Sequence, residues 1–159
     1  MAIIGIVAVD RAGAIGKGGT LPWHYSADLK FFKEQTTGNA CVMGYTTWAS
    51  LKKPLPNRLN IVLTRRDDVE PRESVLWARD KQSVLSLNEY LKCDLYVLGG
   101  AQVFELFRAD IDRWLVTEVP LTVEAADTFL PPRLLEGFRP QDTRDLGDDL
   151  KVTFYEREG

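Results

Sequence analysis

Four short runs of mainly apolar residues limit the fold of this sequence more than any other feature. They occupy residues 3–9, 40–43, 60–64 and 95–98, and they are rich in isoleucine and valine. A strand with one face in water alternates apolar and polar residues, whereas a strand covered on both faces is a continuous apolar run. The runs therefore predict a mostly parallel sheet that is buried between helices.

The stretches around these runs complete an α/β pattern. Four of them have the spacing expected of helices: residues 26–34, 46–51, 82–90 and 100–107. Ser26 is a residue type that caps helices, and we expect it to cap the first of them. In the last third of the chain, residues 112–119 and 151–157 read as two strands separated by a loop region rich in proline and aspartate. The sequence thus predicts a central, mostly parallel, twisted sheet with an antiparallel C-terminal end and about four flanking helices.

Size and composition exclude several classes of protein. The 159 residues, of which 45% are hydrophobic and 27% charged, suit one globular domain that spans residues 1–159 without a linker or an internal repeat. A net charge of −3 argues against general binding to nucleic acid. No apolar run approaches the roughly 20 residues of a membrane-spanning helix, and the N-terminus lacks the basic start of a signal peptide. We therefore expect a cytoplasmic protein and, because no exposed apolar stripe is evident, a monomer.

Metal and disulfide chemistry have little support in the sequence. Cys41 and Cys93 are too few for a disulfide framework or a four-thiolate site, and each reads as a small buried hydrophobic residue. His24 is the single histidine, which excludes a histidine-rich metal centre. No metal site is therefore predicted.

A glycine-rich segment, residues 13–23, lies between the first strand and the first helix. It contains four glycines and ends in Leu21, Pro22 and Trp23. Glycine-rich segments taken alone are most often flexible surface connections. A stiff, apolar end on such a loop is also what a lid over a ligand requires, so both interpretations stay open at this point.

Asp28 falls in the first turn of the helix expected at residues 26–34. A carboxylate at that position complements the helix dipole, which is a common structural role. Phe31 and Phe32 follow it at helical spacing, however, and a carboxylate held against an apolar wall has a raised affinity for protons and for paired N–H donors. Asp28 is therefore also suited to bind an amidine-like ring edge through two parallel hydrogen bonds.

Several strand ends carry residues that suit anions. Gly44, and likewise Gly99 and Gly100, leave the backbone of a following helix open to a phosphate, although tight strand–helix turns need glycine as well. Residues 64–66, Thr-Arg-Arg, are either a grip for a phosphate monoester or a solvated basic turn, and both are equally supported. Arg58 follows a proline-rich turn that can present its guanidinium to a carboxylate. The GxGxxG pattern of dinucleotide-binding folds is absent.

Six motifs occur in an order that resembles the dihydrofolate reductase family over essentially the whole chain. They are residues 15–23, 26–33 with Asp28, 42–48, 54–58, 98–100 and 127–129. Each motif is short, but their shared order and spacing argue strongly against chance agreement.

The resemblance implies an NADPH-dependent oxidoreductase that reduces 7,8-dihydrofolate to 5,6,7,8-tetrahydrofolate. A hydride would pass from the nicotinamide to C6 of the pterin, while N5 gains a proton from solvent with electrostatic help from Asp28. The activity would support one-carbon metabolism and thymidylate synthesis, and antifolates such as methotrexate or trimethoprim would inhibit it. Within the single domain, residues 39–90 would form an adenosine-binding subdomain.

The resemblance also assigns roles on the substrate side. It implies catalytic roles for Asp28, Leu21, Trp23 and Thr117, and substrate binding by Ile4, Asp28, Leu29, Phe32, Leu51, Leu55, Arg58 and Leu98. Asp28 would bind the N3 and 2-amino edge of the pterin, with Thr117 supporting it through water and Trp23 holding a further water. Arg58 would pair with the α-carboxylate of the glutamate tail.

The cofactor side is assigned in the same way. The resemblance implies NADPH contacts for Ile6, Ile15, Gly44, Tyr45, Thr46, Thr47, Thr64, Arg65, Gly99, Gly100, Ala101, Gln102, Val103 and Phe104. Residues 99–103 would cradle the pyrophosphate, with a cis bond between the two glycines, and Thr64 and Arg65 would contact the 2′-phosphate. Ile6 would offer backbone groups to the nicotinamide, and Ile4 to the pterin, both at the end of the first strand.

Three departures from the family's usual pattern bear on the cofactor and the lid. Tyr45 stands where many relatives carry a basic residue near the cofactor phosphates, which puts the strength of the NADPH preference in question. Phe104 replaces a tyrosine often found beside the nicotinamide, and the segment from Thr117 to Asp127 is one residue longer than in common bacterial relatives. Two alternatives remain: a riboflavin-pathway pyrimidine reductase of the same fold, and a ligand-binding module without catalysis.

Overall fold

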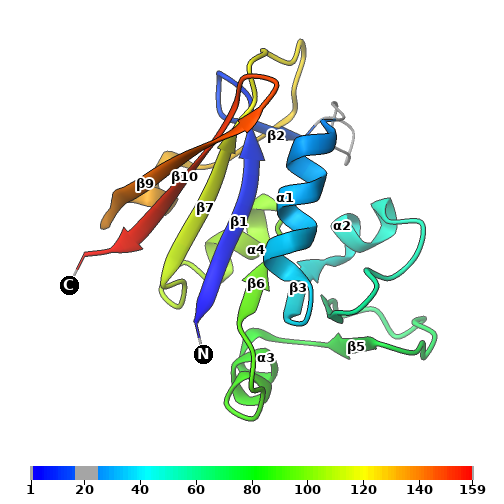
Figure 1. Cartoon of the computed structure of the whole chain (residues 1–159). Coiled ribbons are helices and arrows are strands. Elements are labelled where there is room, and N and C mark those ends of the chain that lie inside the picture. Colours follow the sequence, from blue (N-terminus) through cyan, green and yellow to red (C-terminus); the bar gives the residue numbers. More distant parts are fainter. Residues whose placement is uncertain (1, 17–24, 159) are drawn as a thin grey trace.

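Eight strands make up the main sheet in a computed structural model, which describes residues 2–16 and 25–158 of the chain (Figure 1). The strands of this sheet lie in the order β5-β4-β3-β6-β1-β7-β10-β9, and β2 pairs separately with β8. The elements are β1 (Ile3–Val9), β2 (Ala14–Gly16), α1 (Ser26–Thr36), β3 (Ala40–Gly44), α2 (Tyr45–Ser50), β4 (Leu59–Leu63), β5 (Val75–Ala78), α3 (Lys81–Asn88), β6 (Leu95–Val97), α4 (Ala101–Leu106), β7 (Arg113–Glu118), β8 (Thr128–Phe129), the 3₁₀ turn η1 (Pro132–Leu135), β9 (Phe138–Gly147) and β10 (Leu150–Arg157).

Strand direction divides the main sheet into two parts. The pairings among β5, β4, β3, β6, β1 and β7 are parallel, and β10 runs antiparallel to both of its neighbours, β7 and β9. The prediction of a mostly parallel sheet with an antiparallel C-terminal end is confirmed. Parallel strands place their carboxyl ends along one edge, which is where ligands bind in open α/β sheets.

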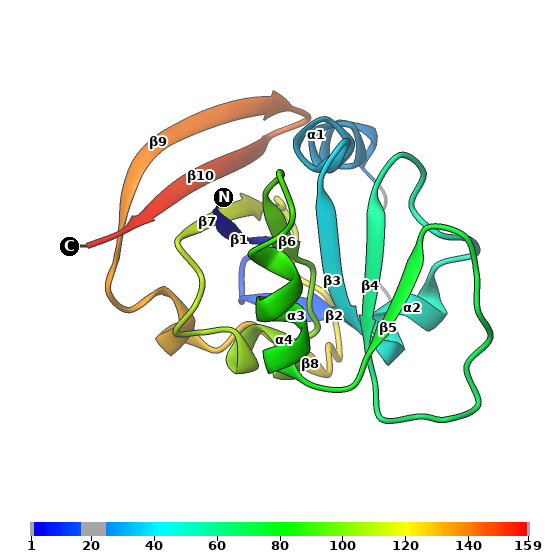
Figure 2. The same ribbon diagram turned by 90° about the horizontal axis from the view of Figure 1, so that it is seen from below.

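The parallel part of the sheet is covered on both faces, which explains the continuous apolar runs. On β1, Ile3 and Val9 belong to one buried cluster, whereas Ile4 and Ile6 belong to another. Residues of α3 and α4 pack in the first cluster, and residues of α1 and α2 pack in the second. Figure 2 shows α1 and α3 on opposite sides of the sheet. Successive residues of one strand therefore enter two different cores.

A glycine in β1 makes room for the largest side chain of the core. The Cβ of any other residue at position 5 would lie 2.5 Å from the ring of Trp114, the register partner of Gly5 on β7. Trp114 is 1% exposed, and the centre of its ring lies 5.1 Å from that of Phe104 on α4. Gly5 thus allows β1, β7 and α4 to pack closely at the centre of the molecule.

The four predicted helices are present, with ends shifted by one or a few residues. Helix α1 begins at Ser26 itself, Tyr25 occupies the N-cap position with an extended backbone, and no side chain caps the helix. The predicted cap at Ser26 is therefore wrong, because a capping residue must lie outside the helical backbone. No helix among the described residues is long and apolar enough to cross a membrane.

The region between β7 and β10, predicted as a loop, contains β8, η1 and β9. Strand β9 is ten residues long, yet nearly all of its side chains are exposed and its sequence carries the proline and aspartates of a turn. Its one paired neighbour among the described strands is β10, and Phe138 and Leu146 are the β9 side chains that pack against buried residues. The strands β2, with three residues, and β5, with four, were not predicted either.

Candidate active site

A cavity of about 1160 Å³ opens along the carboxyl edge of the parallel strands. It is lined by residues at or just after the ends of β3, β4, β5 and β6, together with residues of β1, α1, α4 and β7. Cavities for one small molecule usually measure roughly 300–1,000 Å³. This cavity therefore lies above the usual range for one small molecule.

Nearly all of the predicted site residues that the structure describes line this cavity. From the substrate and catalytic sets, these are Asp28, Leu29, Phe32, Leu51, Leu55, Arg58, Leu98 and Thr117. From the cofactor set, they are Ile6, Ile15, Gly44, Tyr45, Thr46, Thr47, Thr64, Arg65, Gly100, Ala101, Gln102, Val103 and Phe104. Leu21 and Trp23 lie outside the described residues, and so does most of the predicted lid.

Ile4 and Gly99 are the two described residues of the prediction that do not line the cavity. Ile4 is the second residue of β1 and Ile6 the fourth, so neither lies at the end of the strand as predicted, and the Ile4 side chain is 2% exposed within the core. Gly99 is buried, and its carbonyl accepts a hydrogen bond from the Gly44 N–H at 2.9 Å. Its φ of +105° and the 3.0 Å from an added Cβ to Phe104 restrict this position to glycine. Gly99 thus joins the ends of β3 and β6, and the peptide bond that follows it is cis.

Asp28 lies in the first turn of α1 and lines the cavity. Burial raises the pKa of its carboxyl above the usual value, and a side-chain hydrogen bond with Thr117 acts in the opposite direction with a smaller effect. Phe31 and Phe32 also line the cavity, and Phe31 packs on Phe154 with ring centres 6.1 Å apart. Among the described residues Asp28 has no ion-pair partner, so its carboxyl is available to bind paired N–H donors.

Arg58 lies near the same helix, with its guanidinium carbon 5.9 Å from the centre of the Phe32 ring. Its Nε donates to the Pro56 carbonyl at 2.9 Å, and its Nη1 donates to the Thr36 hydroxyl at 3.0 Å. Only 8% of Arg58 is exposed, and burial lowers its pKa. The two hydrogen bonds orient the guanidinium and leave Nη2 without a partner among the described residues. Arg58 can therefore pair with a carboxylate inside the cavity.

Another part of the cavity wall consists of two strand–helix junctions. Gly44 ends β3 and precedes α2, and Gly100 lies between β6 and α4. A Cβ added to Gly100 meets nothing within 4 Å, so the cavity reaches the backbone there. The N–H groups of residues 101–103 precede the first intrahelical bond, in which Phe104 donates to the Gly100 carbonyl at 3.0 Å. With no backbone partner in the part of the chain that the structure describes, these N–H groups suit an anion such as a pyrophosphate.

A third junction follows β4, where Thr64 and Arg65 line the cavity. The Thr64 N–H donates to the Ala78 carbonyl at 2.8 Å, which brings the end of β5 to the same wall and adds Arg79 and Asp80 to it. Within the described part of the chain, Arg65 forms no hydrogen bond or ion pair. Its guanidinium is therefore free to bind a phosphate.

The lining contains several residues to which the sequence analysis assigned no role in the site. The polar ones are Lys33, Ser50, Arg79, Asp80 and Thr128, and the others are Val7, Ala8, Gly16, Leu63 and Leu106. A signal existed for Arg79 and Asp80, because they follow a short apolar run at residues 75–78 just as Thr64 and Arg65 follow β4. Lys33 ends the motif at residues 26–33, and for Ser50 the sequence offers no signal beyond its proximity to predicted site residues.

The fold and the cavity together define a class of protein. A parallel sheet places three anion-suited strand ends in the same cavity as a partly buried carboxyl and a buried arginine. This arrangement is that of an α/β enzyme that holds a phosphate-bearing cofactor beside a second, smaller ligand.

Comparison with known proteins identifies the family. The family model described as dihydrofolate reductase matches residues 2–157. The chain belongs to the dihydrofolate reductase family, which confirms the resemblance seen in the sequence.

Individual relatives agree with this assignment. A dihydrofolate reductase of Mycobacterium tuberculosis (strain ATCC 25618 / H37Rv) is 38% identical over 138 residues, which cover 82% of this chain and 81% of the relative. One of Haemophilus influenzae is 33% identical over 126 residues, which cover 79% of this chain and 76% of the relative. Among solved structures, dihydrofolate reductase from Enterococcus faecalis complexed with NADP(H) and RAB-propyl has a TM-score of 0.91 at 33% identity, over 99% of this chain and 97% of that one.

Proposed function

We propose that the cavity is the active site in which this chain, as a member of its family, reduces 7,8-dihydrofolate to 5,6,7,8-tetrahydrofolate with NADPH. The reaction combines a hydride transfer to C6 of the pterin with protonation of N5. The observation that carries the proposal is one continuous cavity that joins the anion-suited ends of β3, β4 and β6 to Asp28 and Arg58.

The residues of the three junctions fit NADPH. Gly100 leaves the backbone open, and the N–H groups of residues 101–103, which have no backbone partner among the described residues, can donate hydrogen bonds to a pyrophosphate. Thr64 offers a hydroxyl, and Arg65 a cation with no ion-pair partner among the described residues, for the 2′-phosphate. When bound, NADPH supplies the hydride, and the protein supplies binding, orientation and electrostatics.

Asp28 binds the N3 and 2-amino edge of the pterin through two parallel hydrogen bonds. The ionised carboxylate can accept both bonds, and Thr117 helps to hold it in place. The apolar surroundings that raise the pKa of Asp28 also strengthen its attraction for positive charge. The carboxylate therefore favours the pterin that has gained a proton on N5 from solvent, without itself delivering that proton.

The apolar part of the lining forms a slot for the pterin and benzoyl rings. Its residues are Leu29, Phe32, Leu51, Leu55 and Leu98. Leu29 is 53% exposed although it is apolar, and a ring bound in the slot would cover it. At the end of this slot the oriented guanidinium of Arg58 pairs with the α-carboxylate of the glutamate tail. The slot and Arg58 thus fix the substrate for hydride transfer, which is a positioning task.

The test is the dihydrofolate-dependent loss of NADPH absorbance with purified protein. Rapid oxidation that methotrexate abolishes is the expected result. Tight binding of NADPH without oxidation would overturn the assignment of the substrate, and a riboflavin-pathway pyrimidine substrate would then be tried. Trimethoprim provides a second inhibitor for comparison.

We also propose that residues 39–90 act as an adenosine-binding subdomain. This range contains β3, β4 and β5 and therefore two of the three junctions. The roles of Leu21 and Trp23, the monomeric state and the cytoplasmic location stay predictions. Size-exclusion chromatography with light scattering tests the state of association.

A further inference from the structure

Three arginines surround the end of β4, where the phosphate of the cofactor is proposed to bind, and two of them form ion pairs with aspartates. Arg66 forms an ion pair with Asp68 at 2.9 Å, and Arg79 forms one with Asp67 at 2.8 Å. Arg65 has no partner within the described residues. Two consecutive aspartates thus offset much of the positive charge around the end of β4, where Arg65 and Arg79 line the cavity and Arg66 lies behind Tyr45 of its wall.

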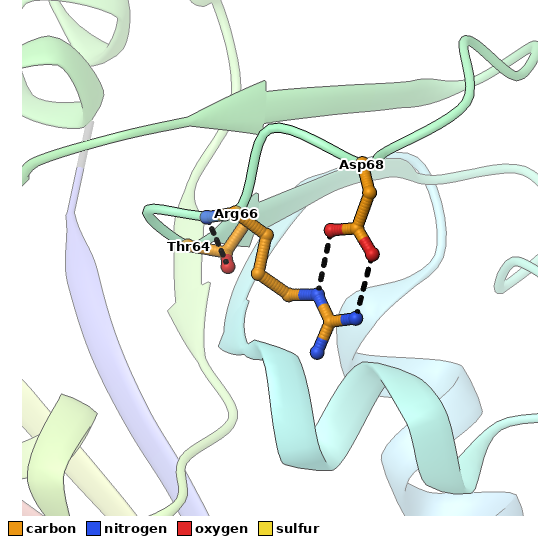
Figure 3. A network of polar contacts seen from close by, with 3 residues as sticks. All are labelled: Thr64, Arg66 and Asp68. Atoms are coloured by element: carbon orange, nitrogen blue, oxygen red, sulfur yellow. Dashed lines mark hydrogen bonds and ion pairs between the residues drawn. The ribbon is translucent and has the colours of Figure 1, made fainter.

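The pair of Arg66 and Asp68 has a defined geometry (Figure 3). The Arg66 Nε and Nη2 donate to the two oxygens of Asp68 at 3.0 and 2.9 Å, a bidentate arrangement. The Arg66 N–H also donates to the Thr64 hydroxyl at 3.2 Å. The guanidinium carbon lies 4.3 Å from the centre of the Tyr45 ring, which lines the cavity. Arg66 is therefore bonded to one residue of the proposed phosphate site and stacked on another residue of the cavity wall.

The structure assigns to Asp68 a role in cofactor specificity: through Arg66, it weakens the binding of a 2′-phosphate and so lowers the preference for NADPH over NADH. This inference rests on the proposed function, since it concerns the cofactor of the same site. Asp68 acts in two ways. Its charge opposes that of Arg66, and its two hydrogen bonds hold the guanidinium in the direction of the loop.

Tyr45 makes the effect of Asp68 on cofactor binding larger. Because the ring of Tyr45 holds the Arg66 guanidinium by a cation–π contact, the arginine would stay beside the cavity if Asp68 lost its charge. A phosphate dianion attracts such a free guanidinium, whereas the hydroxyl of NADH does not. Removal of the Asp68 charge should therefore strengthen the binding of NADPH, which carries the 2′-phosphate, and leave the binding of NADH unchanged.

The experiment measures the dissociation constants of NADPH and NADH by titration calorimetry, which does not depend on turnover. Asp68→Asn is expected to lower the Kd of NADPH roughly two- to fivefold, the range that exposed ion pairs support. The Kd of NADH should stay unchanged, and the gain for NADPH should fade at high salt. Asp142→Asn is the matched control, because it removes the same charge from an exposed position on β9, at the opposite edge of the sheet.

A double variant, Asp68→Asn with Arg66→Ala, shows whether the effect passes through Arg66. The gain in NADPH affinity should vanish in this background. An unchanged Kd for NADPH, equal changes for both cofactors, the same gain from Asp142→Asn, or a gain that persists without Arg66 would each overturn the inference. If the unaltered protein neither bound NADPH nor oxidised it with dihydrofolate, the proposed function would fail as well, whereas a failure in Asp68→Asn alone leaves that function intact.

Discussion

The two ends of the cavity use charge in opposite ways. At the substrate end, Asp28 and Arg58 are each without an ion-pair partner among the described residues, and Arg58 is almost fully buried. At the cofactor end, arginines and aspartates are exposed and largely paired with each other, as in Arg66 with Asp68. A charge withdrawn from water acts strongly and resists salt, whereas an exposed and paired charge acts weakly and is screened. We therefore expect single substitutions at the first end to change activity much more than those at the second.

The largest effect should come from Asp28→Asn. An amide accepts at one oxygen only and carries no charge, so it neither binds the paired N–H edge of the pterin nor favours its protonation. Turnover at neutral pH should fall by at least roughly a hundredfold and should recover in part at lower pH, where the substrate is protonated without help. Steady-state rates from pH 5 to 8 provide the measurement, and full activity at pH 7 would contradict the proposed mechanism.

The second largest effect on activity should come from Arg58→Leu. A hydrogen-bonded ion pair is worth about 1.5–3 kcal/mol, so the KM for dihydrofolate should rise roughly ten- to a hundredfold while kcat changes less. The matched comparison is a dihydropterin substrate without a glutamate tail, for which the KM should not change. A rise of equal size in the KM for both substrates would mean that Arg58 shapes the cavity and does not bind the glutamate tail.

A smaller effect is expected at the exposed end from Arg65→Ala. The KM for NADPH should rise roughly fivefold at low salt, because an exposed ion pair contributes up to about 1 kcal/mol, and the KM for NADH should stay nearly constant. The difference should shrink as salt is added. Arg139→Ala, which removes an exposed arginine from β9, serves as the control. Equal effects on the two cofactors would show that Arg65 does not contact the 2′-phosphate.

The smallest effect concerns stability. Burial raises the pKa of Asp28 in the folded protein, so the unliganded protein loses stability as the pH rises above the pKa of the unfolded chain. Asp28→Asn should therefore raise the Tm at pH 7, by no more than about 2–4 °C, which corresponds to about 1 kcal/mol for a chain of this length. At a pH below the unfolded pKa both side chains are neutral, and the two proteins should melt together. A lower Tm for the variant at pH 7 would indicate that the charge of Asp28 stabilises the fold.

Strands with two covered faces could be predicted from the sequence, and strands without a covered face could not. Strands β1, β3, β4 and β6 lie at the centre of the parallel sheet, so burial demands continuous apolar runs. Strand β9 lies at an edge with nearly all side chains in water, and its position depends on backbone pairing with β10. Backbone pairing places few demands on side chains, which is why the sequence of β9 reads as a loop.

Some residues of the candidate site could likewise be predicted from the sequence, and others could not. Residues within a motif, such as Asp28 or Gly100, could be found because the chemistry and the local backbone lie in one stretch of sequence. Arg79 reaches the cavity only because β5 pairs with β4 in the register that puts Ala78 beside Leu63. Likewise, the sequence shows two arginines followed by two aspartates at residues 65–68, but not that the Asp68 carboxylate bonds to the Arg66 guanidinium. Such contacts depend on tertiary pairing, which local pattern does not encode.

The position of β6 between β3 and β1 has a consequence for the folding of the chain during its synthesis on the ribosome. Leu95 pairs with both Ile3 and Ala40, and β1 and β3 have no pairing with each other. A nascent chain therefore releases two apolar strands long before the strand that joins them, and each has an open edge during that interval. Open apolar edges attract chaperones and other unfinished chains. The N-terminal half therefore exposes apolar strand edges until β6 has been made, and a chain that stops before Leu95 cannot complete its central sheet.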